Sequence, residues 1–425
     1  MTQAISWPEE YAALIERLPR IIDRSRLVVG GFSTCVDIYL SLHEVFGPLK
    51  AHLHEAAECA SLLRELKHRA VNGVGGELFF DWPDGATWID RHVAGKNAIG
   101  GTAAQASYML AQLGAQSLTA LEDRSAGQLA VLHPDSLVAT KSGMVPVSTL
   151  APETDGRAPH YIFEFTAGER LDGENIPRSS RIIVCFEHSP LQHDPEFVRV
   201  SLEHAPQAGA GILCGFNEVH PEQMDEELDY AAETGEAWHR AGLPLLHLEL
   251  ADFPNAQMRD ATIDRILPVA NSLSMSLSEL KELTGEVTSP VDAALKLAQT
   301  HALERICVHA DTWAFTVTRD TAKRELDAIM TGCLLASARA AAGYFAVPRQ
   351  IPEHAEFRIP PLPVFSESDG WSVVCCAAPY LEKPAATIGL GDTFLAGTLL
   401  VLGGSSASGH APAFGNSLKG GVASL

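Results

Sequence analysis

The 425-residue sequence has no apolar run of membrane-spanning length and no cysteine pair spaced Cys-x-x-Cys. We therefore expect no transmembrane helix. The first ten residues lack a basic stretch followed by an apolar one, so we expect no signal peptide. Most of the eight cysteines sit in apolar runs, which argues against a zinc site or a disulfide framework. Their placement predicts reduced, buried thiols in a cytoplasmic protein.

Basic residues are scarce: 31 Lys and Arg stand against 53 Asp and Glu, which gives a formal net charge of −22. The acidic residues are dispersed along the chain. This balance disfavours a nucleic acid or an anionic membrane surface as a partner. It leaves a phosphorylated small molecule possible, because backbone N–H groups and Mg²⁺ can override the overall field.

Short apolar runs alternate with helical patterns from about residue 180 onward. The expected strands there are 181–186, 211–214, 244–250, 266–270 and 305–309. The expected helices are 221–241, 255–264, 276–284 and 290–302. Earlier in the chain we expect a strand at 26–31, a helix at 102–114 and a strand at 118–121. The alternation predicts an α/β fold of three layers, with a central, mostly parallel sheet between two layers of helices.

Two stretches depart from this alternation. Residues 36–95 and 125–178 hold polar turns and an expected strand at 161–165, and we interpret them as a smaller, β-rich lid domain. The large α/β nucleotide-binding domain would then comprise residues 1–35, 96–124 and 179–425. A chain of 425 residues is long enough for two such domains.

The most informative segment is Thr387–Gly397, where two glycines frame a turn and Asp392 stands at the start of an apolar helix. A helix start offers unpaired N–H groups and the positive end of the helix dipole. Glycines let an anion approach that backbone. The segment predicts phosphoryl transfer to a hydroxyl: Gly389, Leu390 and Gly391 would form an anion hole, and Asp392 would be the general base. The alternative is a simple turn and helix cap.

Four segments, in order along the chain, resemble motifs of the ADP-dependent glucokinase/phosphofructokinase family, a branch of the ribokinase-like sugar kinases. They are 387–393 (its catalytic Gly-x-Gly-Asp), 247–249 (its His-x-Glu), 271–280 (its Ser-x-Gly-x-Asn-Glu-x-Glu-Leu) and 99–104 (its Gly-Gly-Gln-Ala-Gly). The likeness covers about residues 28–400. It implies a ribokinase-like fold and a kinase that moves a phosphoryl group from Mg-ADP to a hydroxyl of a hexose or hexose phosphate, leaving AMP.

The resemblance also assigns roles to single residues. It implies Glu249 and Glu279 as metal-binding, Asp37, Glu77, Gly100 and Gly101 as sugar-binding, and Val308 and His309 as nucleotide-binding. Five of these residues also have a plainer interpretation. Glu279 and Glu77 would be surface acids, Asp37 would support its own turn, and the two glycines would only precede a helix.

The segments also depart from the family pattern. Ser276 and Leu277 replace the family's Asn-Glu, which removes a carboxylate from the metal region. This departure leaves open a catalytically weak regulator that binds sugar or nucleotide. The general ribokinase-like scaffold and a loose match at the adenine pocket leave open an ATP-dependent ribokinase-like carbohydrate kinase. The expected partners are a small-molecule sugar and a nucleotide, and the sequence does not fix the oligomeric state.

The acceptor is open as well. Glu77 favours an unphosphorylated hexose such as glucose. Arg178, Arg181 and Lys141 would instead suit a sugar phosphate, because Arg and Lys side chains bind phosphate oxygens. The alternative is that they are solvated charges, which we favour for Lys141.

Overall fold

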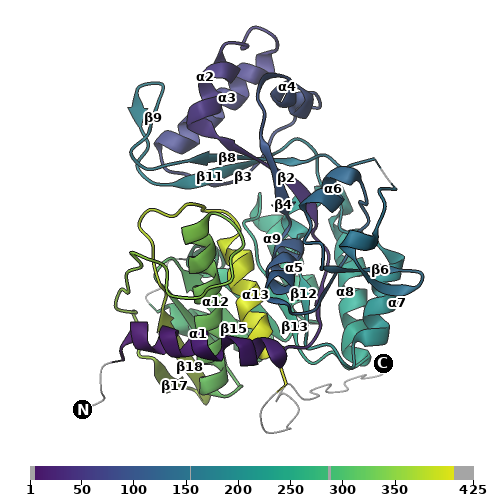
Figure 1. Cartoon of the computed structure of the whole chain (residues 1–425), viewed down its shortest axis with the longest axis vertical. Helices are drawn as coiled ribbons and strands as arrows, with labels where there is room; N and C mark the ends of the chain where they lie inside the picture. The colour runs from purple at the N-terminus through teal and green to yellow at the C-terminus, as the bar shows by residue number, and fades with distance from the viewer. Residues whose placement is uncertain (1–4, 154, 286–288, 406–425) are drawn as a thin grey trace, which may run out of the picture.

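The computed structural model describes residues 5–153, 155–285 and 289–405. This part of the chain forms a larger domain around an 11-stranded sheet and a smaller domain around a five-stranded sheet, which lies above it in Figure 1. A short hairpin, β9 (Arg170–Leu171) with β10 (Glu174–Asn175), extends from the smaller domain. No described helix is long and apolar enough to cross a bilayer. Residues 1–4 and 406–425 of the expected large domain lie outside the described residues.

The large sheet has the strand order β17-β18-β16-β15-β14-β13-β12-β1-β5-β6-β7. The strands from β15 to β6 run parallel, and β7, β16, β17 and β18 run antiparallel to their neighbours. The strands are β1 (Val28–Gly30), β5 (Ser117–Thr119), β6 (Leu137–Thr140), β7 (Gly143–Pro146), β12 (Ala210–Leu213), β13 (Leu246–Glu249), β14 (Ser272–Ser276), β15 (Arg305–Ala310), β16 (Trp313–Thr318), β17 (Phe365–Ser368) and β18 (Trp371–Ala377). The central parallel strands are buried because helices cover both faces of the sheet.

One face of the large sheet packs against α7 (Pro195–His204), α8 (Met224–Arg240), α9 (Ala256–Ile266), α10 (Leu277–Thr284) and α11 (Pro290–Thr300). The other face packs against α1 (Trp7–Asp23), α5 (Thr102–Leu113), α12 (Ala322–Ala342) and α13 (Leu390–Leu402). The predicted three-layer α/β architecture with a mostly parallel central sheet is thus confirmed.

The small sheet has the order β3-β11-β8-β2-β4. Its strands are β2 (Cys35–Ser41), β3 (Gly76–Phe79), β4 (Lys96–Gly100), β8 (His160–Phe165) and β11 (Ser180–Cys185). One face packs against α2 (Leu42–Lys50), α3 (Ala57–Val71) and α4 (Gly85–His92) to form a separate apolar core. Because side chains alternate along a strand, the other face carries the polar residues of β2, β3 and β8.

The two expected lid segments meet in this sheet, since Asp37 of β2 pairs with His160 of β8. The sheets nevertheless shift the expected boundaries. Strands β4 and β11, expected in the large domain, belong to the small sheet. Helix α6 (Ala126–Val131) is followed by β6 and β7, and β6 extends the large sheet because Leu137 pairs with Leu118 of β5.

The strand expected at 266–270 is wrong. Helix α9 continues to Ile266, a turn follows, and the strand β14 starts at Ser272. The apolar run marks the buried end of a helix, and Pro268 cannot continue that helix.

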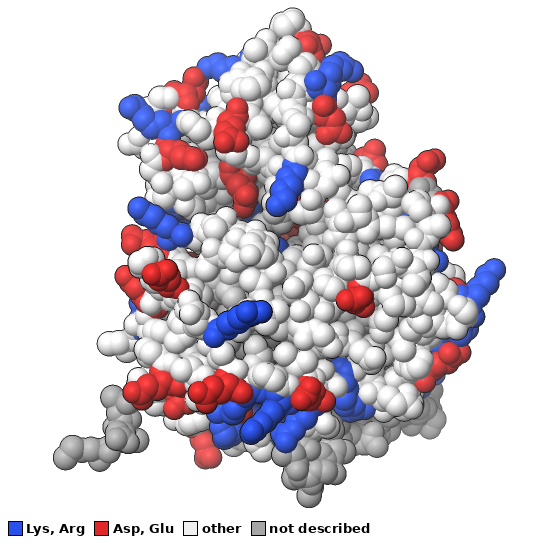
Figure 2. All heavy atoms as spheres, in the orientation of Figure 1, with Lys and Arg blue, Asp and Glu red and all other residues white. Residues whose placement is uncertain are grey.

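Acidic and basic side chains are interspersed over the face drawn in Figure 2, on both domains. On this face the acidic excess of the sequence is therefore spread rather than gathered into one patch.

Candidate active site

Asp392 lies in the first turn of α13. Gly389, directly before the helix, has φ 67°, a left-handed conformation that glycine adopts at little cost. The first hydrogen bond inside the helix runs from the N–H of Thr393 to the carbonyl of Gly389 at 3.0 Å. The N–H groups of Leu390, Gly391 and Asp392 precede that bond, so they are available to an anion.

The two glycines of this turn differ in their surroundings. A Cβ on Gly389 would lie 2.1 Å from Gln105 Oε1 and 2.3 Å from an Arg339 nitrogen, so any side chain there clashes. A Cβ on Gly391 would meet nothing nearer than His309, at 3.9 Å. Gly389 is thus required by the fold, and Gly391 leaves open space beside Asp392.

Arg339 of α12 holds the turn in place. Its buried guanidinium donates to the carbonyl of Gly389 at 2.9 Å, to Thr393 Oγ1 at 3.0 Å and to Gln105 Oε1 at 2.7 Å. Helices α5, α12 and α13 are thereby joined at one point. Burial raises the pKa of Asp392, while the Arg339 charge and a hydrogen bond with Thr102 oppose that rise.

Asp37 of β2 lies on the face of the small sheet that is opposite its helices, and it is 4% exposed. Its Oδ1 occupies the space above Gly100, where a Cβ would lie 2.1 Å away. Gly101, with φ 84°, likewise makes room for Ser33. The two glycines therefore allow Asp37 and Ser33 to pack closely against the backbone.

Carboxylates gather around Asp37. Burial raises the pKa of Asp37 to about 7, with His160 opposing the rise and Glu218 and Asp392 adding to it. Burial and Asp392 raise the pKa of Glu218, at the end of η2 (Phe216–Glu218), to about 7. The charge of Asp392 thus raises the pKa of both Asp37 and Glu218.

Glu77 of β3 joins the same group. Burial and the Glu218 charge raise its pKa to about 8, although Asn217 donates a hydrogen bond of 2.7 Å to Glu77 Oε1 and opposes the rise. A pocket beside these groups is lined by Glu77, Glu187, Glu218 and His188, with no Lys or Arg in its lining.

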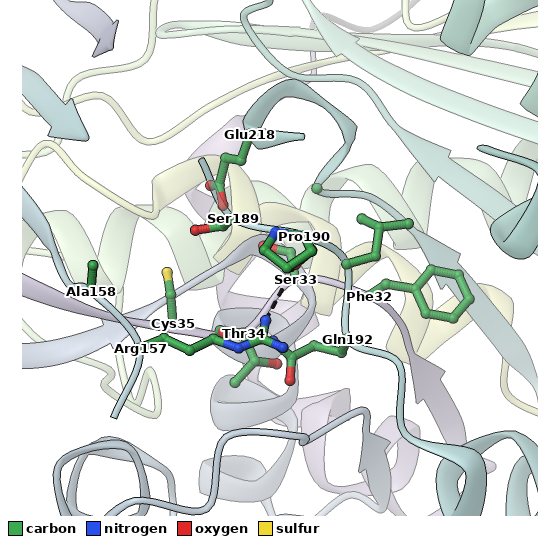
Figure 3. A pocket seen from close by; sticks show the side chains of 12 residues that line it. Phe32, Ser33, Thr34, Cys35, Arg157, Ala158, Ser189, Pro190, Gln192 and Glu218 are labelled. Atoms are coloured by element: carbon green, nitrogen blue, oxygen red, sulfur yellow. Dashed lines mark hydrogen bonds between the residues drawn. The ribbon is translucent and has the colours of Figure 1, made fainter. Parts of the chain in front are cut away.

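A second pocket lies next to Cys35 and Glu218, and Arg157 also lines it. In Figure 3 the Glu218 carboxylate and the Arg157 side chain lie on opposite sides of this pocket. Arg157 already pairs with Glu122 at 2.6 Å and donates to the carbonyl of Pro190 at 3.3 Å. Its charge is therefore largely satisfied within the protein.

Glu249 ends β13 on the large sheet, and a chain of buried groups orients it. Arg305 donates to Ser272 Oγ at 3.3 Å, Ser272 lies 2.8 Å from His247 Nδ1, and His247 Nε2 lies 3.1 Å from Glu249 Oε2. Since an ionised Glu249 only accepts, Nε2–H donates to it, and Nδ1 of the neutral ring accepts from the Ser272 hydroxyl. Burial alone would raise the pKa of Glu249, but His247 and His309 lower it to about 2.

His309 of β15 connects this carboxylate to the glycine turn. Its Nε2 lies 3.8 Å from Glu249 Oε1, and its ring packs against Phe394 of α13 with centroids 5.1 Å apart. Burial opposes protonation of His309, but Glu249 and Glu279 raise its pKa. Val308 points the other way and is fully buried in the apolar core, and its strand is paired on both sides, with β14 and with β16.

Glu279 lies in the first turn of α10. Its Oε2 accepts from the Ser276 N–H at 2.6 Å, and its own N–H donates to Ser276 Oγ at 3.2 Å, which forms a capping box. Burial raises the pKa of Glu279 to about 7 against those hydrogen bonds. Ser276, which replaces a family asparagine, thus serves as the helix cap.

Sequence reasoning missed Glu218, Arg339 and Thr102. Glu218 follows a buried parallel strand, and polar residues after such strands face the ligand crevice. Arg339 is a single cation in an alanine-rich helix segment, which signals a buried partner. Both signals were readable, whereas nothing near Thr102 in the sequence points to Asp392.

Comparison with known sequences places the chain. The ADP-specific Phosphofructokinase/Glucokinase conserved region matches residues 26–401. The chain is 25% identical over 270 residues to the ADP-dependent glucose/glucosamine kinase of Pyrococcus furiosus, which covers 55% of this chain and 58% of that protein. It is 23% identical over 424 residues to the ADP-specific phosphofructokinase of the same organism, which covers 86% of this chain and 92% of that one.

Solved structures share the fold. An ADP-dependent kinase in complex with fructose-6-phosphate and ADPβS superposes with a TM-score of 0.73 at 18% identity, over 94% of this chain and 99% of that one. A hypothetical ADP-dependent phosphofructokinase from Pyrococcus horikoshii OT3 gives a TM-score of 0.71 at 16% identity, over 89% and 98%. The chain belongs to the ADP-specific phosphofructokinase/glucokinase family of sugar kinases, which are phosphotransferases with a hydroxyl acceptor.

Proposed function

We propose that this protein transfers the β-phosphoryl group of Mg-ADP to a hydroxyl of an unphosphorylated hexose, such as glucose, and releases AMP. The observation that carries the proposal is the position of Asp392. It stands at a helix start with open N–H groups, and its charge acts on both Asp37 and Glu218. One carboxylate thereby adjoins an anion site and an acceptor site.

Asp392 orients the acceptor O–H and accepts its proton during transfer. The N–H groups of Leu390, Gly391 and Asp392, at the positive end of α13, hold the transferring group. The Arg339 charge and Thr102 counter the effect of burial, so they favour the ionised Asp392 that a base requires.

The large-domain end of the site has donors suited to Mg²⁺, which prefers oxygen ligands. Glu249 is held ionised, and the buried Ser274 hydroxyl beside it has no hydrogen-bond partner among the described residues. We assign Glu249 to the metal, with Glu279 as a more distant carboxylate. When bound, Mg²⁺ neutralises charge on the phosphates. His309 would then border the nucleotide, with Val308 buried behind it in the sheet.

The charges around Asp37 favour an uncharged acceptor. Asp37, Glu77 and Glu218 crowd together, and carboxyl groups with raised pKa values both donate to and accept from sugar hydroxyls. Arg157 is already paired, and Lys141 and Arg178 are exposed. A phosphate ester placed among these carboxylates would be repelled.

A hexose phosphate is the second candidate, and one observation favours it. The Arg181 charge, on β11, opposes the rise in the pKa of both Glu77 and Asp392, and its buried Nε has no hydrogen-bond partner among the described residues. The related kinase of similar fold is bound to fructose-6-phosphate. Arg181 is the cation that such a ligand would meet.

The test measures AMP formation with Mg-ADP and, in a separate assay, ADP formation with Mg-ATP. Both assays use a panel of hexoses and hexose phosphates as acceptors. We expect turnover with ADP and glucose or a close analogue. Turnover with fructose-6-phosphate alone would assign the second candidate. Absence of AMP with every acceptor would contradict the proposed activity.

A further inference from the structure

The outer side of the small domain carries a cluster of side chains that phosphoryl transfer does not use. His52 and Glu55 lie between α2 and α3, and His92 is the last residue of α4. These helices lie on the side of the small domain away from the large domain (Figure 1). Glu55 Oε1 lies 2.9 Å from His52 Nδ1 and 3.2 Å from His92 Nε2. One donor atom from each residue therefore meets at a point, all within 4.8 Å of one another.

The hydrogen bonds of His92 define what its other nitrogen needs. His92 Nδ1 lies 2.7 Å from the carbonyl oxygen of Trp88, which can only accept, so Nδ1 carries a proton. In a neutral imidazole, Nε2 then holds a lone pair that faces an accepting oxygen of Glu55. That contact is favourable only when a cation stands between the two atoms, either a second proton on His92 or a metal ion.

The neighbouring histidine favours the metal ion. The rings of His52 and His92 lie with their centroids 3.9 Å apart. A proton on His92 would satisfy only the contact between His92 and Glu55, whereas a metal ion reaches the Nδ1 of His52 as well. A single ion bound by both nitrogens and by Glu55 satisfies all three groups without placing a charge on either ring.

The surroundings resemble the outer shell of a metal site. Besides the bond from His92 Nδ1–H to a backbone carbonyl, the Trp88 indole donates to Glu55 Oε2 at 3.0 Å. Partners of this kind fix the tautomer of a metal-binding histidine and the orientation of a ligating carboxylate. The separations of 2.9 and 3.2 Å approach the distance between ligand atoms around tetrahedral zinc, about 3.3 Å for bonds of about 2.0 Å.

We propose that His52, Glu55 and His92 bind a divalent transition-metal ion such as Zn²⁺. Two imidazoles with one carboxylate suit such an ion better than Mg²⁺, which prefers oxygen ligands. The His52 side chain is 40% exposed, so water reaches the remaining coordination position. The ion fastens the loop after α2 to the end of α4 and stabilises the folded small domain.

The test uses the full-length protein, stripped with a chelator and titrated calorimetrically with Zn²⁺ in excess Mg²⁺. We expect the wild type to bind one equivalent of zinc more than His52→Ala or Glu55→Gln. Zinc also raises the melting temperature of the wild type more than that of either variant. His68→Ala, which removes an exposed histidine of the neighbouring α3, is the matched control and keeps the equivalent.

Equal zinc stoichiometry and equal zinc-induced melting shifts in the wild type and His52→Ala overturn the proposal, as does a wild type that binds no zinc. The measured quantity is the difference in bound zinc between the wild type and each variant. Zinc bound elsewhere on the protein is the same in both and does not affect that difference. If His52→Ala melts abnormally without zinc, His52→Asn replaces it, because the shorter amide keeps a polar group near the position of Nδ1, beside Glu55.

Discussion

Buried carboxylates on the large sheet and on the small sheet have opposite pKa shifts. Glu249 on the large sheet is paired with His247 and His309, which lower its pKa to about 2. Asp37 and Glu77 on the small sheet lie in a crowd of acids, and their pKa values rise to about 7 and about 8. A carboxylate that the protein keeps ionised suits a metal ion and a nucleotide. Carboxyl groups whose pKa values stay raised despite His160 and Arg181 suit the hydroxyls of a neutral sugar.

The largest expected effect concerns Asp392, whose pKa responds to Glu249 and whose charge raises that of Asp37. Asp392→Asn keeps the size of the side chain but removes the proton acceptor. We expect turnover to fall by roughly two to four orders of magnitude, the range for a general base. The measurement is kcat for AMP formation, and Asp260→Asn, at an exposed site on α9, is the control. A near-normal kcat would remove the role of Asp392.

The next prediction concerns Glu249, whose pKa His247 and His309 lower. His247→Gln breaks the chain from Arg305 through Ser272 to Glu249, which should raise the pKa of Glu249 and weaken its hold on a cation. We expect the Mg²⁺ concentration for half-maximal rate to rise by about 10–100-fold, as for other lost partners of metal ligands. His301→Gln, at the end of α11, is the control. An unchanged Mg²⁺ requirement would separate Glu249 from the metal.

A smaller effect is expected at Asp37, whose pKa is raised. Loss of sugar affinity on acidification should follow Asp37, because a protonated carboxyl accepts fewer hydrogen bonds. Glu218 raises the pKa of Asp37, so Glu218→Gln should move the acidic limb of kcat/KM for the sugar to lower pH, by up to about one unit. The exposed Glu222→Gln should leave the limb in place. A limb that moves to higher pH in Glu218→Gln would contradict the crowding of charges.

The smallest effect is on stability. The pKa of Glu77 in the folded protein, about 8, lies above its ordinary value of 4.5, so the folded state binds the extra proton. Its stabilising contribution is full below pH 4.5 and is lost as pH rises to about 8. For Glu249, at about 2, the contribution is present above pH 4.5 and is lost as pH falls towards 2.

Glu77→Gln should therefore reduce the loss of melting temperature between pH 5 and pH 8 by about 2 °C relative to the wild type. Glu249→Gln should instead make the melting temperature depend less on pH below pH 4.5. If the melting temperatures of the two variants depended on pH in the same way, the opposite pKa shifts of Glu77 and Glu249 would be contradicted.

The sequence predicted those features that local chemistry determines. The glycine turn and helix around Asp392 appear where expected because glycine conformation and helix start are properties of adjacent residues. Strand β14 was misplaced because its buried faces include serines, and Ser272 is buried only because Arg305 and His247 bond to it from other strands. Glu218 and Arg339 reach the site from elements far apart in the chain, so no local pattern joins them to Asp392.

The boundaries between the domains depend on pairing at long range in the same way. The segment of β6 reads like the polar turns of the small domain, and only its pairing with β5 assigns it to the large sheet. By contrast, the helices 221–241 and 290–302 were found within a few residues because their apolar faces repeat at helical spacing.

The most direct measurement follows a label from ADP that carries ³²P in its β-phosphoryl group, with Mg²⁺ and glucose in excess. We expect wild-type protein to yield labelled hexose phosphate and unlabelled AMP in equal amounts, and Asp392→Asn to yield neither at a comparable rate. Label that stays in the nucleotide, or that appears only as inorganic phosphate with every hexose, would contradict it.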